Sequence, residues 1–297
     1  MYKIIIAKIL RLLPNKAAKN PMVNQPPLKV RKDFVVQTSI GPTPVSLYYP
    51  LEAQQKKRPV YINFHGGAFI MNDKDMDEPY CNYLANETGC AILNIGYVKA
   101  PEYPFPNAIE QSYEVLQWLK RETDDLDIDS EKIMVGGQSS GGNFAAALCL
   151  YLQDKQEKQP LLQVLSYPML DFVTPFAEKP EPNKLRARYP QVANFLNMSY
   201  VPEEEMARNP LASPVYADIN DDLAPALILI ADHDAFRPEA EKYAEKLKTA
   251  GVSVQDEFFT GCHHAFTHLG PKEKAQEAWQ LIAWKIKETV GSKEEFR

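Results

Sequence analysis

The sequence lacks the residue patterns that mark several large classes of protein. Its four cysteines are scattered without C-x-x-C spacing, which is unlike a zinc site or a redox pair. It has no block of lysine and arginine, and its net charge of -6 gives no electrostatic footprint for nucleic acid. No apolar run is long enough to span a bilayer. We therefore expect a cytoplasmic protein with reduced, packed cysteines and no nucleic-acid partner.

The bulk composition is compatible with one large core. A chain of 297 residues could form two domains on length alone, but α/β folds commonly reach this size around a single sheet. The hydrophobic fraction of 45% and the charged fraction of 24% are ordinary for a globular protein. We expect a single domain over residues 1–297.

The first residues form an amphipathic segment. A lysine followed by three isoleucines resembles the start of a signal peptide, but Lys8 and Arg11 interrupt the run. The apolar residues fall instead on one helical face, and they are Tyr2, Ile5, Ile6, Ile9, Leu12 and Leu13. Such a helix either packs on the body of the protein or makes a weak contact with a membrane surface. We expect the packed arrangement.

Strands and helices alternate along most of the chain. The expected strands are residues 33–39 and 44–49, which are joined by a Gly41-Pro42 turn, and then 59–65, 90–95, 133–135, 161–167, 225–231 and 252–259. Helical patterns separate the later strands, and residues 168–210 interrupt the alternation as a proline-dotted insertion. This order predicts an α/β fold with a mostly parallel central sheet and helices on both faces.

A glycine-rich turn at the end of one strand is typical of a nucleophile. Ser139 has Gly137 two residues before it and Gly141 two residues after it, which gives the pattern G-x-S-x-G. Side chains at those two positions would collide across a tight strand-to-helix bend, so glycine is expected at both. Ser140 lacks this symmetric flanking, and Ser139 is therefore the candidate nucleophile.

Residues suited to acid–base work follow other predicted strands. A serine hydroxyl needs a base, and the base needs an acidic partner to fix its tautomer. Asp234 and His264 supply these types in the order serine, acid, histidine, which is the order of α/β-hydrolases. Their neighbours Asp232 and His263 are an alternative pair.

Several motifs in the same order resemble those of one family, the hormone-sensitive-lipase-like bacterial carboxylesterases of the α/β-hydrolase fold. The family patterns H-G-G-G, Y-R-L-A-P-E, G-D-S-A-G-G, S-P-L, D-P-L-R-D-E and H-G-F are similar to residues 65–69, 97–102, 137–142, 213–215, 234–239 and 264–266. The resemblance spans about residues 45–285 and implies Ser139, Asp234 and His264 as the catalytic residues. The chain departs from the patterns at Ala68, Gln138, Ser140, Ala235, Pro238 and Ala265, which bears on substrate preference more than on catalysis.

Backbone N–H groups are expected to form an oxyanion hole. The donors would be Ser140, which follows the nucleophile, together with Gly66 and Gly67 of the glycine turn after the third strand. A side chain at Gly67 would block the approach of the substrate carbonyl. We expect Gly67→Val to abolish activity without unfolding the protein.

Cofactor and metal sites are not expected. The acidic residues Asp73, Asp75, Asp77 and Glu78 lack the glycine and terminal glutamate of a calcium loop and indicate a solvated loop. His264 and His268 have i,i+4 spacing but lack the glutamate of H-E-x-x-H, so a zinc site is disfavoured.

The function expected from these features is that of a serine carboxylesterase acting on short-acyl esters of small molecules. In the family, the N-terminal segment and the insertion form a small cap, which implies cap elements at residues 1–40 and 170–208. The aromatic residues of the insertion serve either the substrate pocket or the core, and they are Phe172, Phe176, Tyr189, Phe195 and Tyr200. An amidase or peptidase with the same triad, and a relative that binds ligands without turnover, are the alternatives.

Overall fold

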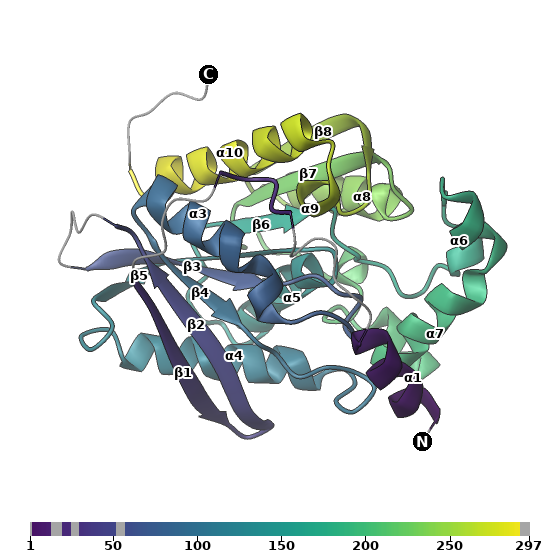
Figure 1. Ribbon diagram of the computed structural model, residues 1–297, viewed down its shortest axis with the longest axis horizontal. Coiled ribbons are helices and arrows are strands. Elements are labelled where there is room, and N and C mark those ends of the chain that lie inside the picture. The colour runs from purple at the N-terminus through teal and green to yellow at the C-terminus, as the bar shows by residue number, and fades with distance from the viewer. Residues whose placement is uncertain (1, 13–19, 25–29, 52–56, 292–297) are drawn as a thin grey trace.

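The computed structural model describes residues 2–12, 20–24, 30–51 and 57–291. The strands are β1 (Val30–Thr38), β2 (Gly41–Tyr49), β3 (Arg58–Phe64), β4 (Ala91–Ile95), β5 (Ile128–Gln138), β6 (Gln163–Ser166), β7 (Ala226–His233) and β8 (Val254–His263). They form one sheet in the order β1-β2-β4-β3-β5-β6-β7-β8 (Figure 1). β2 is antiparallel to both of its neighbours, β1 and β4, and every other neighbouring pair is parallel. The mostly parallel sheet agrees with the prediction from strand–helix alternation.

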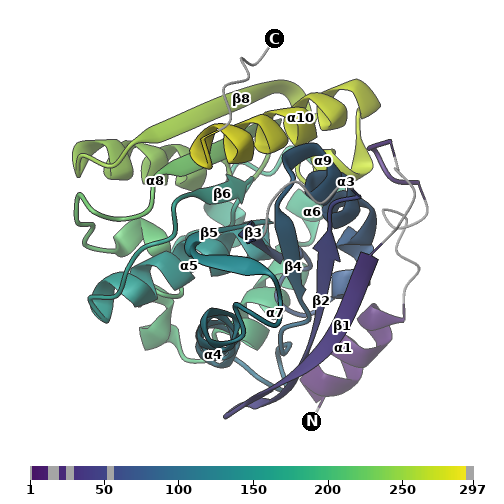
Figure 2. The same cartoon turned by 90° about the vertical axis from the view of Figure 1, so that its left-hand side faces the viewer.

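Helices cover both faces of the sheet. The longer ones are α1 (Tyr2–Arg11), α3 (Glu78–Thr88), α4 (Asn107–Arg121), α5 (Ser140–Asp154), α7 (Pro190–Tyr200), α8 (Arg237–Thr249) and α10 (Lys272–Thr289). The short ones are α6 (Lys184–Arg188), α9 (Phe266–Leu269), and the 3-10 turns η1 (Lys74–Asp77), η2 (Phe176–Glu178), η3 (Glu204–Arg208) and η4 (Pro214–Tyr216). Figure 2 shows α4, α5 and α8 on one side of the sheet and α3 and α10 on the other.

The two cores follow from the alternation of side chains along buried strands. In β3, Val60, Ile62 and Phe64 join the core beneath α4, α5 and α8, whereas Tyr61 joins the core beneath α3 and α10. All four side chains are almost completely buried because helices cover both faces. This arrangement leaves the ends of the strands as the places where polar groups can meet.

The hairpin at the sheet edge turns two residues earlier than predicted. Thr38 pairs with Gly41, so the turn consists of Ser39 and Ile40, and Pro42 already lies in β2. The Thr38 hydroxyl donates to the Gly41 carbonyl at 2.6 Å and accepts from its N–H at 3.2 Å. This side-chain closure fixes the turn ahead of the Gly-Pro signal.

The segments expected to form the cap lie at one end of the molecule, but their limits differ from the prediction. Residues 30–38 of the first segment form β1 in the sheet and so do not belong to a cap. Residues 13–19 and 25–29 lie outside the described residues. The insertion forms η2, α6, α7 and η3, and Figure 1 shows α6 and α7 at the same end as α1.

Helix α1 contacts the body of the protein, but not through its apolar stripe. Ala7 is its one buried residue, and Arg11 donates to the carbonyl oxygens of Ile70 and Ala100 and pairs with Glu102 at 2.8 Å. The apolar stripe is exposed instead, and Leu13 of that stripe lies outside the described residues. In the described part of the chain, every helix is too short or too polar to cross a bilayer.

Candidate active site

The serine of the predicted turn has the strained backbone that the motif requires. Ser139 directly follows β5 with a φ of 55°, a value that residues with side chains seldom adopt. A Cβ at Gly137 would lie 2.4 Å from the Phe64 carbonyl oxygen and 2.5 Å from the carbonyl carbon of Gly141. A Cβ at Gly141 would lie 1.9 Å from the same oxygen of Phe64. The steric reason for glycine on both sides of the serine is confirmed.

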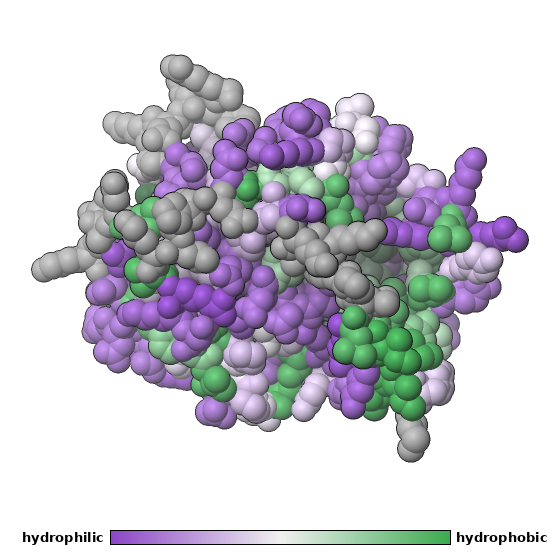
Figure 3. All heavy atoms as spheres, in the orientation of Figure 1, coloured by the Kyte–Doolittle hydropathy of each residue, from purple (hydrophilic) through white to green (hydrophobic). Residues whose placement is uncertain are grey.

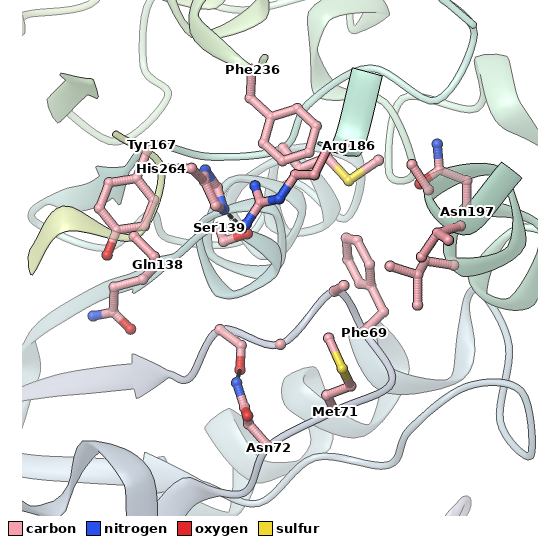
Figure 4. A pocket seen from close by; sticks show the side chains of 18 of the residues that line it. Phe69, Met71, Asn72, Gln138, Ser139, Tyr167, Arg186, Asn197, Phe236 and His264 are labelled. Carbon is pink, nitrogen blue, oxygen red and sulfur yellow. Dashed lines mark hydrogen bonds between the residues drawn. The ribbon is translucent and has the colours of Figure 1, made fainter. Parts of the chain in front are cut away.

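Ser139, His264 and Asp234 meet in one line of hydrogen bonds. Nε2 of His264 lies 2.9 Å from Oγ of Ser139 (Figure 4), and Nδ1 lies 2.7 Å from Oδ2 of Asp234. The three residues follow β5, β7 and β8, whose parallel arrangement brings their carboxyl ends to one edge. If Nδ1 carries the proton donated to the carboxylate, Nε2 is free to accept a proton from the serine. This geometry suits a base-activated nucleophile.

The alternative acid and base make other contacts. Asp232 accepts hydrogen bonds from the Arg237 side chain at 3.1 Å and from the backbone N–H of Gly261 at 3.0 Å. The His263 ring lies against that of His233, with 5.2 Å between centroids. Of the two candidate pairs, the structure therefore brings Asp234 and His264 to the serine.

Three backbone donors lie around the serine turn. A Cβ at Gly66 would lie 3.7 Å from the Cβ of Ser139, so the glycine turn after β3 passes beside the candidate nucleophile. Within the described chain, the N–H groups of Gly66, Gly67 and Ser140 donate to no other group. Unpaired donors next to a nucleophile are suited to bind an oxygen that becomes negative.

The expectation for Gly67→Val needs correction. Gly67 has a φ of +146°, which favours glycine, and a Cβ there would lie 2.3 Å from the carbonyl oxygen of Met71. A valine at this position would force the backbone of the turn to move. The substitution would therefore disturb the turn as well as the expected oxyanion donors, and loss of activity could not be assigned to the donors alone.

His65 holds this glycine turn in place through contacts in the protein interior. Its ring is completely buried, stacks on Tyr97 with 4.2 Å between centroids, and places Nδ1 2.8 Å from the carbonyl oxygen of Gly66. The Tyr97 hydroxyl donates to the His65 carbonyl at 2.6 Å. Burial lowers the pKa of His65 to about 4, so the ring is neutral near pH 7. These contacts suit a residue that positions the turn.

Two aromatic rings hold His264 in place. Tyr167 and Phe236 each meet the imidazole edge-on, both with 5.1 Å between centroids (Figure 4). The backbone N–H of Phe236 also donates to Oδ1 of Asp234 at 3.0 Å, so the acid is bound through both of its oxygens. No local pattern in the sequence marks either aromatic residue as part of the site.

A buried polar network supports Tyr167. Its hydroxyl is hydrogen-bonded to Oγ1 of Thr267, which lies 2.9 Å from Nδ1 of His268. Nε2 of His268 lies 3.1 Å from Oδ1 of Asp77, and Asn63 donates to Oδ2 of Asp77 at 2.8 Å. The network thus joins a strand, the acidic loop and α9 beneath the site.

This network corrects the prediction of a solvated acidic loop. Asp75 is exposed, but Asp77 is completely buried. Burial alone would raise the pKa of Asp77, but the hydrogen bonds from His268 and Asn63 outweigh it and hold the pKa below its usual value. The only sequence signal that involves a member of this network is the i,i+4 spacing of His264 and His268, which resembles a metal motif and does not point to Asp77.

A cavity of about 610 Å³ opens in front of Ser139. Its wall includes Gly66, Ser139 and His264. The segment from α6 to α7 contributes Leu185, Arg186, Tyr189, Val192, Ala193, Leu196 and Asn197. The aromatic residues of the insertion divide between the two expected roles. Phe176 and Tyr189 line the cavity, whereas Phe172 and Tyr200 pack against Phe69 in the core.

Comparisons with known proteins agree with this geometry. A family model described as alpha/beta hydrolase fold matches residues 61–268. An arylesterase from Saccharolobus solfataricus is 27% identical over 95% of this chain and 89% of its own length. An ethyl acetate hydrolase from Pseudomonas putida is 30% identical over 84% of this chain and 80% of its own length. The solved structure of a hyperthermophilic esterase from the archaeon Pyrobaculum calidifontis has a TM-score of 0.83 and 30% identity, and covers 97% of this chain and 89% of that one.

The chain belongs to the hormone-sensitive-lipase-like family of α/β-hydrolases. Its predicted family and fold class are therefore confirmed. Two departures from the family's patterns occur where the backbone is left-handed: Ala68 has a φ of 51° and Ala265 a φ of 65°. The family has glycine at both positions, and glycine adopts this conformation without steric cost. Both alanines also line the cavity.

Proposed function

We propose that this carboxylic ester hydrolase works through a covalent acyl–Ser139 intermediate. The observation that carries the proposal is the line of hydrogen bonds from Ser139 through His264 to Asp234, at 2.9 and 2.7 Å. His264 accepts the serine proton while Oγ attacks the ester carbonyl carbon, and Asp234 stabilises the resulting imidazolium. His264 then gives that proton to the leaving alcohol as the ester bond breaks.

The second half of the reaction repeats these roles with water. His264 removes a proton from a water molecule, whose oxygen attacks the acyl carbonyl, and then returns the proton to Ser139 as the acid is released. In both halves, the N–H groups of Gly66, Gly67 and Ser140 bind the carbonyl oxygen as it becomes negative. Each donor contributes about 10²–10³ in turnover by comparison with other oxyanion holes.

Small esters with short acyl groups are the proposed substrates. A cavity of about 610 Å³ is in the range of small-molecule sites, and its walls are largely apolar. Two relatives are named as an ethyl acetate hydrolase and an arylesterase, which favours small esters here as well. We assign the cap to α1 and to the segment from η2 to η3, since α6 and α7 wall one side of the cavity.

The test is the hydrolysis of p-nitrophenyl esters from acetate to palmitate, and of matching p-nitroanilides. Ser139→Ala should lower kcat by about 10⁶-fold. Ser112→Ala is the matched control. It removes a buried serine of α4 whose hydroxyl donates to the carbonyl oxygen of Ala108, and it should retain activity. Ester hydrolysis by Ser139→Ala at the wild-type rate would show that Ser139 is not the nucleophile. Faster cleavage of anilides would indicate an amidase, and a preference for palmitate would refute the short-acyl proposal.

A further inference from the structure

The apolar stripe of α1 points away from the protein. Ile5, Ile9 and Leu12 are 54%, 57% and 83% exposed, while Ala7 on the opposite side is completely buried. A surface helix of a globular protein normally turns its apolar stripe toward the core. Helix α1 does the reverse, so its apolar side chains are left without a partner in the described chain.

The cap helices extend this surface. Helix α6 has no buried residue, and Leu185 and Val192 are 69% and 60% exposed. Nζ of Lys3 donates to the carbonyl oxygen of Met198 at 3.0 Å, which ties α1 to the end of α7. Figure 3 shows the apolar area over α1 at the lower right. We call Tyr2, Ile5, Ile9, Leu12, Leu185 and Val192 the α1–α7 face.

Basic residues lie on the same helices as this face, without acidic ones. Helices α1, α6 and α7 contain no aspartate or glutamate, although the chain has a net charge of -6. Acidic residues begin again at Glu181 before α6 and at Glu203 after α7. Arg11 pairs with Glu102, and the charge of Lys8 also acts on that carboxylate. The other basic side chains form no salt bridge with a carboxylate among the described residues, and they are Lys3, Lys184, Arg186 and Arg188.

We propose that the α1–α7 face binds the surface of an anionic lipid bilayer. Exposed isoleucine and leucine flanked by lysine and arginine are typical of helices that lie in the membrane interface. Each basic side chain near an anionic surface adds attraction, and the apolar side chains enter the boundary of the acyl chains. A second copy of this chain fits less well, because a two-fold contact would bring the same basic residues against one another.

The position of the cavity gives this surface a use. Leu185, Arg186 and Val192 both line the cavity and are exposed, so they lie at its mouth. When the protein is bound to a bilayer through the α1–α7 face, the mouth of the cavity lies at the lipid surface, where apolar esters concentrate. This consequence rests on the proposed function, whereas lipid binding itself does not.

Sedimentation with vesicles tests the proposal. The full chain should sediment with vesicles of phosphatidylcholine and phosphatidylglycerol at low salt, and much less with phosphatidylcholine alone or at high salt. Ile5→Glu with Ile9→Glu should weaken binding at least ~100-fold. Lys184→Gln with Arg188→Gln should weaken it ~30-fold.

Controls separate this surface from folding and from catalysis. Val35→Glu adds a charge at an apolar β1 residue that is 59% exposed, and it should bind vesicles like the wild type. Ser139→Ala should also bind normally, so failure of the proposed function leaves this test intact. Circular dichroism verifies the fold of each variant. Absence of binding to the anionic vesicles would overturn the proposal. It would also be overturned if the wild type is a dimer, and Ile5→Glu with Ile9→Glu dissociates this dimer but leaves vesicle binding unchanged.

Discussion

Asp77 offers a sharp test of the network beneath the site. Its Oδ1 lies 3.1 Å from Nε2 of His268, and its Oδ2 accepts from Asn63 at 2.8 Å. In Asp77→Asn, one oxygen becomes an NH₂ group, which faces either Asn63 or His268. His268 can accept from this group only if the hydrogen bonds through Thr267 reverse, and the Tyr167 hydroxyl then has no acceptor. Asn63 cannot turn its amide without losing its bonds to Asn94 and Gln138. One buried hydrogen bond is lost and one donor is left unpaired.

The expected loss follows from these two changes. A hydrogen bond to a charged group contributes about 1.5–3 kcal/mol, and an unpaired buried donor costs about 1–3 kcal/mol. We expect Asp77→Asn to lower the free energy of unfolding by about 3 kcal/mol at pH 7. For a chain of this length, that corresponds to a fall in Tm of about 5 °C. Urea denaturation and thermal melts measure both quantities.

The pH dependence and a matched control sharpen this test. Because the folded-state pKa of Asp77 is below the unfolded value, its contribution is complete above the unfolded pKa and is lost as pH falls through the folded pKa. The difference between wild type and Asp77→Asn should thus be constant from pH 5 to 8 and shrink below about pH 4. Asp75→Asn removes an exposed charge from the same loop and should cost less than about 1 kcal/mol. Equal stability of Asp77→Asn and wild type at pH 7, or an equal loss in Asp75→Asn, would refute the reasoning.

Three further substitutions test the remaining contacts. Asp234→Asn should lower kcat by about 10⁴-fold without changing Tm, because the amide favours the wrong tautomer of His264. Normal esterase turnover by this variant would show that Asp234 is not the catalytic acid. Burial raises the pKa of Glu239 to about 7 although Lys179 lies 2.5 Å away, so stability from this carboxyl is present below its unfolded pKa and is lost as pH rises through 7. Lys179→Met should therefore cost about 3–5 kcal/mol at pH 8 and much less at pH 5, and urea melts with no such pH difference would contradict it. Ala265→Gly should raise stability by about 1 kcal/mol because the φ of 65° strains alanine, and a lower Tm would disprove that strain.

The parts of the site that could be predicted are those with a local sequence signal. Gly137 and Gly141 mark the bend at Ser139 because their Cβ atoms would strike backbone across it. The sheet was equally predictable, since buried parallel strands are continuous apolar runs between helical patterns. The ends of the strands were harder to predict. β8 was expected to stop at residue 259 but continues to 263, where it pairs with β7.

The parts that could not be predicted depend on contacts between distant segments. Asp77 and His268 are 191 positions apart, and no local pattern distinguishes Asp77 from the exposed acid two residues before it. The prediction that the apolar stripe of α1 packs on the protein was wrong for the same reason. Its periodicity shows that one face is apolar, but which face meets the protein is decided by Arg11 and its partner Glu102 across the fold.

The two alanines in left-handed backbone connect the fold to substrate choice. Ala68 follows the glycine turn with the proposed oxyanion donors, and Ala265 follows His264. Each holds a conformation that glycine adopts without cost, and each carries a methyl group into the wall of the cavity. Relative to the family's glycines, these methyl groups take up space in the cavity in front of Ser139 and leave the hydrogen bonds of the site in place. We therefore expect these departures from the family pattern to limit the size of the substrate, in line with the proposed preference for small esters, at some cost in backbone strain.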